Sequence, residues 1–173
     1  MINAPTYDPE AVQPMRDEMI ANGFEELIAP EDVDNVLNRE GTALLFINSV
    51  CGCSAGSARP GTNLALQHST IPNHLVTMFA GQEKEAIEYF RQKHLSKYMP
   101  SSPFIALFKD GQLVYTMQRF EIEGTPPEEV ANRLKTEFDK NCTRKGPSIS
   151  PKEFENTERF RQCGSKIPLH NQN

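Results

Sequence analysis

Two cysteines separated by one glycine, Cys51-Gly52-Cys53, are the residues of this sequence best suited to chemistry. They directly follow a short apolar run and precede a segment with helical spacing. A helix N-terminus offers unpaired N–H groups and the positive end of the helix dipole, so a thiolate at Cys51 would be stabilised there. A thiolate is the species that attacks a disulfide, and Cys53 is close enough to resolve the mixed disulfide that forms. The motif therefore predicts thiol–disulfide exchange.

The one-residue spacing also constrains the disulfide form of the pair. Closing Cys51 to Cys53 makes a ring of about eleven atoms, and geometry this tight stores strain. A strained disulfide has a higher reduction potential than a relaxed one, and Gly52 best tolerates the backbone conformation required. We therefore expect the pair to pass its disulfide on readily, or Cys51 alone to form mixed disulfides with a small thiol.

The elements around the motif follow the order α-α-β-α-β-α-β-β-α. Apolar runs at 42–50 and 74–80 indicate strands covered on both faces, and Asp110-Gly111 joins 104–109 to 112–120 in a hairpin. Apolar residues at helical spacing predict the helices, at 9–22, 31–40, 54–67, 83–98 and 125–141. This order predicts an α/β thioredoxin-like fold, a mixed central sheet with helices on both faces.

Two details of this scheme concern individual residues. The first helix, capped by Asp8, is expected to bury Val12, Met15, Met19 and Ile20. Pro60 lies inside the helical segment that follows the cysteines, so that helix either begins with an irregular turn or is kinked at the proline.

The dipeptide Ser102-Pro103 stands directly before the hairpin. Thioredoxin-like folds carry a cis-proline just before the third central strand, facing the cysteine motif. Topology therefore predicts a cis bond here, although only about 5–6% of X-Pro bonds in folded proteins are cis. We expect Gly52, Ser102 and Pro103 to form the surface that receives the substrate.

Composition limits the classes of partner. The chain has 173 residues and a net charge of -5, which gives no general attraction for nucleic acid or anionic lipid. No apolar run approaches the ~20 residues that span a bilayer, and residues 1–5 lack the pattern of a secretory signal. We therefore expect a cytoplasmic protein with no nucleic-acid or membrane partner, in a compartment that keeps thiols reduced.

Residues 1–142 are expected to form the thioredoxin-like domain, including an N-terminal helical extension. After Cys142 the sequence becomes polar and is punctuated by prolines. We interpret residues 143–173 as a polar C-terminal tail, with a short helix around 153–162.

A Cys-x-Cys pair can also supply two soft ligands to a metal ion, so a metal-binding or redox-sensing module is the alternative of a different class. Zinc normally takes four ligands, and an iron–sulfur cluster meets the same requirement. The sequence offers no clear second pair, because Cys142 and Cys163 are distant from each other and His68 and His74 are unpaired. We therefore expect no metal and no bound cofactor.

Several other residues are interpreted without a catalytic role. Cys142 is expected to be a half-buried or surface thiol and Cys163 an exposed one. His94 falls on the apolar side of its helix and is expected to be packed. Arg59 either attracts an acidic substrate or is a solvated helix residue. Glu121 and Glu123 are expected at a solvated strand end.

The segment NSVCGCSAG at 48–56, with Ala58-Arg59-Pro60, closely resembles the bacilliredoxin family. So do PSSP at 100–103, EIEG at 121–124 and a final helix ending at Cys142, and the resemblance covers roughly residues 5–142. Two features depart from it: Phe120 stands where the family usually has a histidine, and residues 143–173 lie beyond the family's usual end.

The resemblance implies a thioredoxin-like fold and removal of bacillithiol from S-bacillithiolated proteins. The residue matching Cys51 attacks and takes up bacillithiol, the thiol co-substrate, and the residue matching Cys53 resolves. A flavin-dependent disulfide reductase is the implied recycling partner. A general disulfide reductase or isomerase is the alternative activity.

Overall fold

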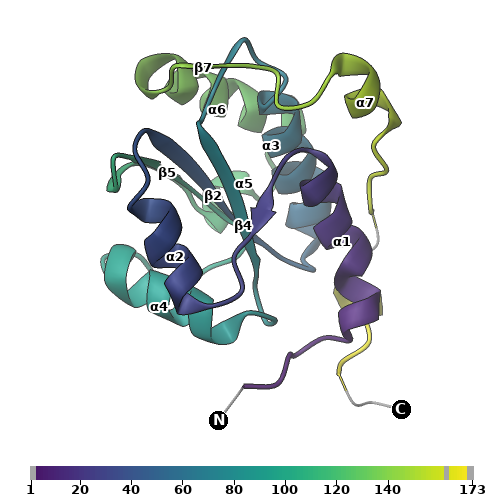
Figure 1. Cartoon of the computed structure of the whole chain (residues 1–173). Coiled ribbons are helices and arrows are strands. Elements are labelled where there is room, and N and C mark those ends of the chain that lie inside the picture. The colour runs from purple at the N-terminus through teal and green to yellow at the C-terminus, as the bar shows by residue number, and fades with distance from the viewer. Residues whose placement is uncertain (1–2, 162–163, 171–173) are drawn as a thin grey trace.

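A five-stranded mixed sheet forms the centre of the molecule, in the strand order β1-β4-β2-β5-β6 (Figure 1). The computed structural model describes residues 3–161 and 164–170. β4 is parallel to both β1 and β2, whereas β5 is antiparallel to β2 and β6. The strands span Glu25–Glu26 (β1), Thr42–Asn48 (β2), His74–Phe79 (β4), Phe104–Lys109 (β5) and Gln112–Met117 (β6).

β2 is the central strand, and all seven of its residues are buried. Leu44 and Phe46 belong to the apolar cluster on one face of the sheet, whereas Leu45 and Ile47 belong to the cluster on the other face. A strand covered on both faces needs apolar residues in both phases of its alternation. This is why the sequence of β2 is apolar throughout, as predicted.

Helices cover both faces of the sheet. α3 and α6 pack together on one face, with α1 beside α3, and α2 and α4 pack together on the other (Figure 1). The arrangement is the predicted thioredoxin-like fold. These helices span Pro9–Ala21 (α1), Pro30–Leu37 (α2), Arg59–Ala65 (α3), Lys84–His94 (α4) and Pro127–Asn141 (α6).

The helix after the cysteines begins irregularly, which was the first of the two predicted alternatives. A π-helical turn, Ser54–Ala58, precedes α3, and the N–H of Arg59 donates to the carbonyl of Ser54. Pro60 has no N–H, and its ring would clash with the carbonyl four residues earlier in a regular α-helix. The wider turn accommodates the proline at the start of α3.

Three local predictions are wrong. β6 ends at Met117, and Arg119–Ile122 form a short helix, α5, in which the Glu121 carboxylate accepts the Gln118 N–H at 2.8 Å. Glu121 and Glu123 therefore do not end a strand. Ile20 is 44% exposed, because the buried face of α1 consists of Val12, Met15, Glu18 and Met19. α4 ends at His94, not at 98, and the chain then turns toward β5.

The residues interpreted as a polar tail pack along the domain instead. We call residues 143–161 and 164–170 the C-terminal segment. It contains β7 (Arg144–Lys145), paired with β3 (Thr70–Ile71), then α7 (Pro151–Asn156), and the one-turn helix η2 (Gly164–Lys166). Its Ile167 is 7% exposed and belongs to the apolar cluster that contains Val12 and Met15 of α1. A short helix is present as predicted, but it spans Pro151–Asn156, capped by Ser150, rather than 153–162.

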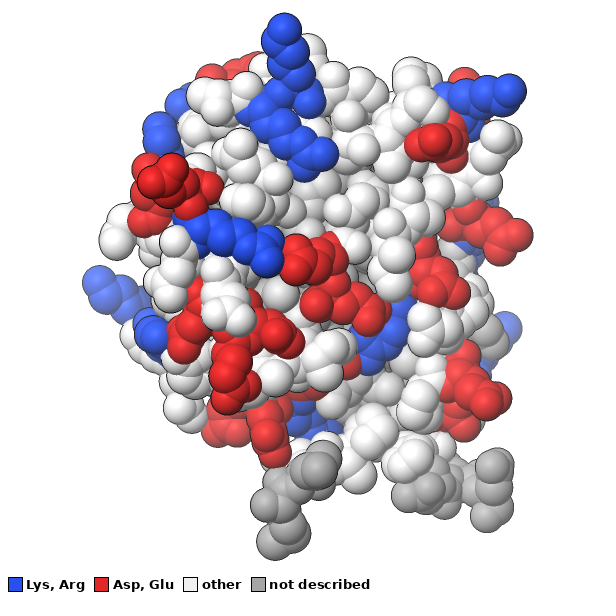
Figure 2. All heavy atoms as spheres, viewed as in Figure 1, with Lys and Arg blue, Asp and Glu red and all other residues white. Residues whose placement is uncertain are grey.

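Acidic and basic side chains are interspersed over the face of the molecule drawn in Figure 2. Within residues 3–161 and 164–170, no helix has the length and apolar character needed to cross a membrane.

The contact between α3 and α6 gives a test of this packing. A Cβ atom added at Gly61 would lie 2.6 Å from the Cβ of Val130 and 2.9 Å from the carbonyl oxygen of Pro127. We expect Gly61→Ala to lower the free energy of unfolding by roughly 1–3 kcal/mol, because the helices must separate. Urea unfolding measures it.

Gly56→Ala is the matched control, since a Cβ there would meet nothing within 4 Å. This control should keep or raise the stability, because alanine restricts the unfolded chain more than glycine does. Equal stability of the two variants would contradict the close packing of α3 against α6.

Candidate redox site

The cysteine motif lies at the carboxyl end of β2, the edge at which open α/β sheets place their functional sites. Helical backbone begins at Gly52 and continues through the π-turn into α3. Cys51 and Cys53 are joined by a disulfide bond, and their Cα atoms are 5.4 Å apart. Both cysteines are partly buried and Gly52 is exposed, so the pair is open to solvent at the glycine.

Cys51 occupies the N-cap of this helix. Its carbonyl accepts the N–H groups of Ser54 and Ala55, at 3.0 and 3.2 Å. Its sulfur accepts the N–H of Cys53 at 3.3 Å, and its own N–H donates to the Ser49 hydroxyl at 3.1 Å. An N-cap acceptor that carries negative charge is favoured by the helix dipole and by the unpaired N–H groups. The setting therefore favours the thiolate of Cys51 when the pair is reduced.

The Ser102-Pro103 peptide bond is cis, as topology predicted. Phe104, the next residue, pairs with Ile47 in β2. Pro103 therefore lies beside the end of β2, where the chain leaves the sheet for Cys51. Pro103 is buried and Ser102 is partly exposed. The fold thus brings these two residues to the same sheet edge as the cysteines.

Arg59 is the feature that the sequence analysis missed. Its side chain is fully buried, and its Nε lies 3.0 Å from the Glu18 carboxylate. Its Nη1 donates to Asn48 Oδ1 at 3.1 Å, to the Ser49 carbonyl at 2.9 Å and to the Ser54 hydroxyl at 3.3 Å. Both expectations for Arg59 are wrong, because it neither faces substrate nor is solvated. Its hydrogen bonds to Ser49 and Ser54 join the residues before and after the cysteine motif.

The C-terminal segment completes this ion pair. Nη2 of Arg59 donates to the carbonyl of Phe160 at 2.9 Å, and the N–H of Phe160 donates to the Glu18 carboxylate at 3.2 Å. Burial raises the pKa of Glu18 and lowers the pKa of Arg59, and their mutual attraction opposes both shifts. One signal was present in the sequence: Arg59 is the sole charged residue between Cys53 and Gln67.

Asn48 is a second residue of this support. Its Oδ1 accepts the N–H of Ser49 at 2.8 Å and the Ser54 hydroxyl at 3.2 Å, in addition to Arg59. Its Nδ2 donates to the carbonyl of Met15 in α1 at 3.1 Å. The loop that carries Cys51 is therefore fixed to β2, α1 and α3.

The remaining cysteines lie apart from the motif or outside the described residues. Cys142 is a free thiol, and it is 7% exposed rather than half-buried. Burial raises the pKa of the Cys142 thiol, and the nearby Thr42 side chain opposes this shift. Thr42 begins β2 whereas Cys51 follows its end, so the length of the strand separates the two thiols. Cys163 lies outside the described residues.

The structure also places the other residues that the sequence analysis singled out. His94 packs against Phe90 and Phe108, with ring centroids 5.7 Å apart in each case, as expected. Burial lowers the pKa of His94. Phe120 is 74% exposed on α5. In the part of the chain that the structure describes, no group of three or more His, Cys, Asp or Glu side chains could hold a metal ion.

A cleft of about 330 Å³ opens beside the motif. Its walls come from the start of the helix after Cys51, from α3 and α6, and from the C-terminal segment. The lining residues are Gly52, Ala55, Gly56, Pro60, Pro127, Arg159 and Arg161.

Taken together with the fold, the cysteine pair determines the class of protein. Cysteines at a helix N-terminus can exchange electrons with other thiols through a mixed disulfide. The chain is a thiol–disulfide oxidoreductase with a thioredoxin-like fold.

Comparison with known proteins identifies the family. The profile of a family described as disulphide isomerase matches residues 7–142. A bacilliredoxin from Bacillus cereus is 44% identical over 142 residues, which are 82% of this chain and 98% of the relative. A bacilliredoxin from Halalkalibacterium halodurans is 48% identical over 137 residues, 79% of this chain and 94% of the relative. The chain belongs to the bacilliredoxin family.

A solved structure, the thioredoxin from Aeropyrum pernix, aligns with a TM-score of 0.45 and 18% sequence identity. The alignment covers 64% of this chain and 85% of that thioredoxin.

The buried ion pair gives the next prediction. Arg59→Met leaves the Glu18 carboxylate buried without its partner, so we expect a loss of roughly 3–5 kcal/mol in the free energy of unfolding. The double variant Glu18→Gln with Arg59→Met removes both charges and should lose less. Urea unfolding at pH 7 compares the two. A double variant that is less stable than Arg59→Met would show that the pair does not act as a unit.

The N-cap position of Cys51 predicts its acidity. In the reduced protein the pKa of Cys51 should lie below the ~8.5 of a free cysteine, because the helix N-terminus stabilises the thiolate. The measurement is the rate of alkylation by iodoacetamide against pH, resolved by peptide mass spectrometry. Cys142 is the internal control, and burial should keep it unreactive to higher pH. A midpoint for Cys51 at or above that of a free cysteine would refute the N-cap argument.

Proposed function

We propose that this protein removes bacillithiol from S-bacillithiolated proteins, with Cys51 as the attacking and Cys53 as the resolving cysteine. The observation that carries the proposal is the bonded Cys51–Cys53 pair at a helix N-terminus, in a chain 44–48% identical to proteins named bacilliredoxin. The cytoplasm is the proposed place of action, because a reducing compartment keeps the pair available as thiols.

The first step transfers bacillithiol to the enzyme. The Cys51 thiolate attacks the bacillithiol sulfur of the mixed disulfide, a bond from Cys51 to bacillithiol forms, and the substrate protein leaves as a thiolate. The N–H of Cys53, 3.3 Å from the Cys51 sulfur in the disulfide form, favours the thiolate before the attack. Gly52, Ser102 and Pro103 form the surface that receives the substrate.

The second step returns bacillithiol to solution. The Cys53 thiolate attacks the sulfur of Cys51, bacillithiol leaves as a thiolate, and the Cys51–Cys53 disulfide forms. The described structure contains this disulfide. Two electrons then restore the dithiol, and a flavin-dependent disulfide reductase is the proposed donor. The cycle as written uses no bound cofactor.

A general disulfide reductase or isomerase is the second candidate, and the description of the matched family as disulphide isomerase favours it. The same two cysteines would act, but the attacked bond would join two protein cysteines. A metal-binding or redox-sensing module is the third candidate, since the same two sulfurs could serve as soft ligands.

Intact mass after mixing reduced enzyme with a bacillithiolated model protein tests the proposal. Cys53→Ser should retain one bacillithiol on Cys51 while the substrate is released, because the resolving step is blocked. Cys51→Ser should take up none and leave the substrate modified. Wild type should release the substrate and finish as the internal disulfide.

Two outcomes would point to the other candidates. If no variant takes up bacillithiol, while wild type reduces or rearranges disulfides in a protein substrate, the general activity replaces the proposal. If the reduced protein is purified with stoichiometric zinc that Cys51→Ser lacks, the pair is a metal site and the proposed exchange is wrong.

A further inference from the structure

The cleft beside the motif is lined by small residues near the cysteines and by two arginines at its rim. Gly52, Ala55 and Gly56 contribute almost no side chain, so the space reaches the backbone between the two cysteines. The charged residues among its lining are Arg159 and Arg161. A cleft of about 330 Å³ falls at the lower end of the volumes that small ligands occupy in proteins.

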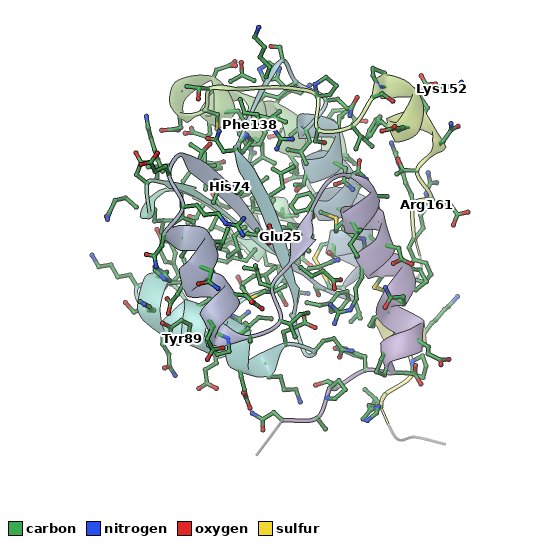
Figure 3. The ribbon with its side chains drawn as sticks, viewed as in Figure 1. Glu25, His74, Tyr89, Phe138, Lys152 and Arg161 are labelled. Atoms are coloured by element: carbon green, nitrogen blue, oxygen red, sulfur yellow. A yellow bond between two sulfur atoms is a disulfide. The ribbon has the colours of Figure 1, made fainter. Side chains whose placement is uncertain are left out.

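Both arginines are positioned by the residue between them. The N–H and carbonyl of Phe160 are bonded to Glu18 and Arg59, at 3.2 and 2.9 Å. The Phe160 side chain packs against the apolar cluster that contains Val50, the residue before Cys51. Arg159 and Arg161, the residues on either side of Phe160, both line the cleft. Figure 3 labels Arg161 on this stretch, after α7.

The two guanidinium groups are available to a ligand. Both side chains are exposed, and among the described residues neither forms an ion pair. Arg159 lies over the ring of Phe154, 5.8 Å from its centroid, which leaves its N–H groups free to donate. Two arginines can bind two carboxylates, each through paired N–H donors.

The proposed reaction places a small molecule at this location. After the first step the thiol is bonded to Cys51, and the next residue, the exposed Gly52, lines the cleft. The cleft is therefore available to the rest of that molecule. Bacillithiol carries a malate group, which has two carboxylates. Its charge is opposite to that of the rim.

We propose that Arg159 and Arg161 bind the carboxylates of the small thiol and thereby make the enzyme select anionic thiols over uncharged ones. The inference rests on the proposed function, and it assigns to the C-terminal segment the recognition of the molecule that Cys51 takes up. The covalent steps are unchanged, since the arginines bind the thiol without reacting.

The test compares two mixed disulfides on the same carrier protein. One carries mercaptosuccinate, which has two carboxylates, and the other carries 2-mercaptoethanol, which is uncharged. The variant is Arg159→Gln with Arg161→Gln, and the readout is the single-turnover rate of carrier release from reduced enzyme. The matched control is Lys152→Gln with Lys166→Gln, which removes the same charge from exposed positions of the same segment that do not line the cleft. Lys152 is labelled in Figure 3.

We expect the arginine variant to lose roughly tenfold or more in rate with mercaptosuccinate, since charge-assisted hydrogen bonds are lost. Its rate with 2-mercaptoethanol should stay within about twofold of wild type, because no charge is recognised there. The lysine variant should match wild type on both substrates. Added salt should slow wild type on mercaptosuccinate only.

The outcomes separate this inference from the function on which it rests. If wild type releases both carriers and the arginine variant is unchanged, or loses rate equally on both, the inference is wrong and the proposed function stands. If the lysine variant loses as much as the arginine variant on mercaptosuccinate, general attraction explains the preference and the cleft site is wrong. If wild type releases neither carrier, the inference is wrong, because the enzyme then does not select anionic thiols as a class, and the intact-mass experiment with bacillithiol decides the proposed function separately.

Discussion

The buried pair of Arg59 and Glu18 is the interaction on which the site depends. Burying two charges is costly, and their attraction offsets the cost only when the remaining donors and acceptors are also satisfied. Here they are satisfied by groups from distant parts of the chain: the end of β2, the cysteine loop, the π-turn and the peptide groups of Phe160. Misplacing any of these would leave a buried charge short of a partner. The pair therefore makes the assembly of the site cooperative.

As a consequence, the loop that carries Cys51 is fixed by contacts at two places. Arg59 and Asn48 form hydrogen bonds to Ser49 and Ser54, which stand on either side of the motif. A Cβ added at Gly164 would lie 2.6 Å from the carbonyl oxygen of Val50, so the C-terminal segment directly contacts the backbone of the residue before Cys51. The exposed parts of the motif can then react while the N-cap geometry is retained.

Much of this could be predicted from the sequence, because the signals are local. The apolar run of β2, the cysteine pair after it and the Asp110-Gly111 turn are each contained within a few residues. The cis bond before Pro103 followed from the order of elements. Local signals failed for α5, where Glu121 caps a short helix and ends β6 early.

The support of the site could not be predicted in the same way. Arg59 meets Glu18 across 41 residues and Phe160 across 101 residues. Periodicity indicates that a position is buried, but it does not identify the group that would compensate a charge there. The prediction that the C-terminal segment is a polar tail was wrong for a related reason. It binds the ion pair through the peptide N–H and carbonyl of Phe160, which every residue except proline possesses, so its polar composition carried no trace of that contact.

Because the C-terminal segment is attached through backbone groups, the residues that perform the chemistry and those proposed to recognise the thiol lie in different parts of the chain. The cysteine pair, Asn48, Arg59 and Glu18 lie inside the region matched by the family, whereas Arg159 and Arg161 lie beyond its end at residue 142. Peptide groups fix the segment, so the side chains on either side of Phe160 can change without loss of the anchor. A chain extension attached in this way can set which thiol enters the cleft while the dithiol and its buried support stay the same.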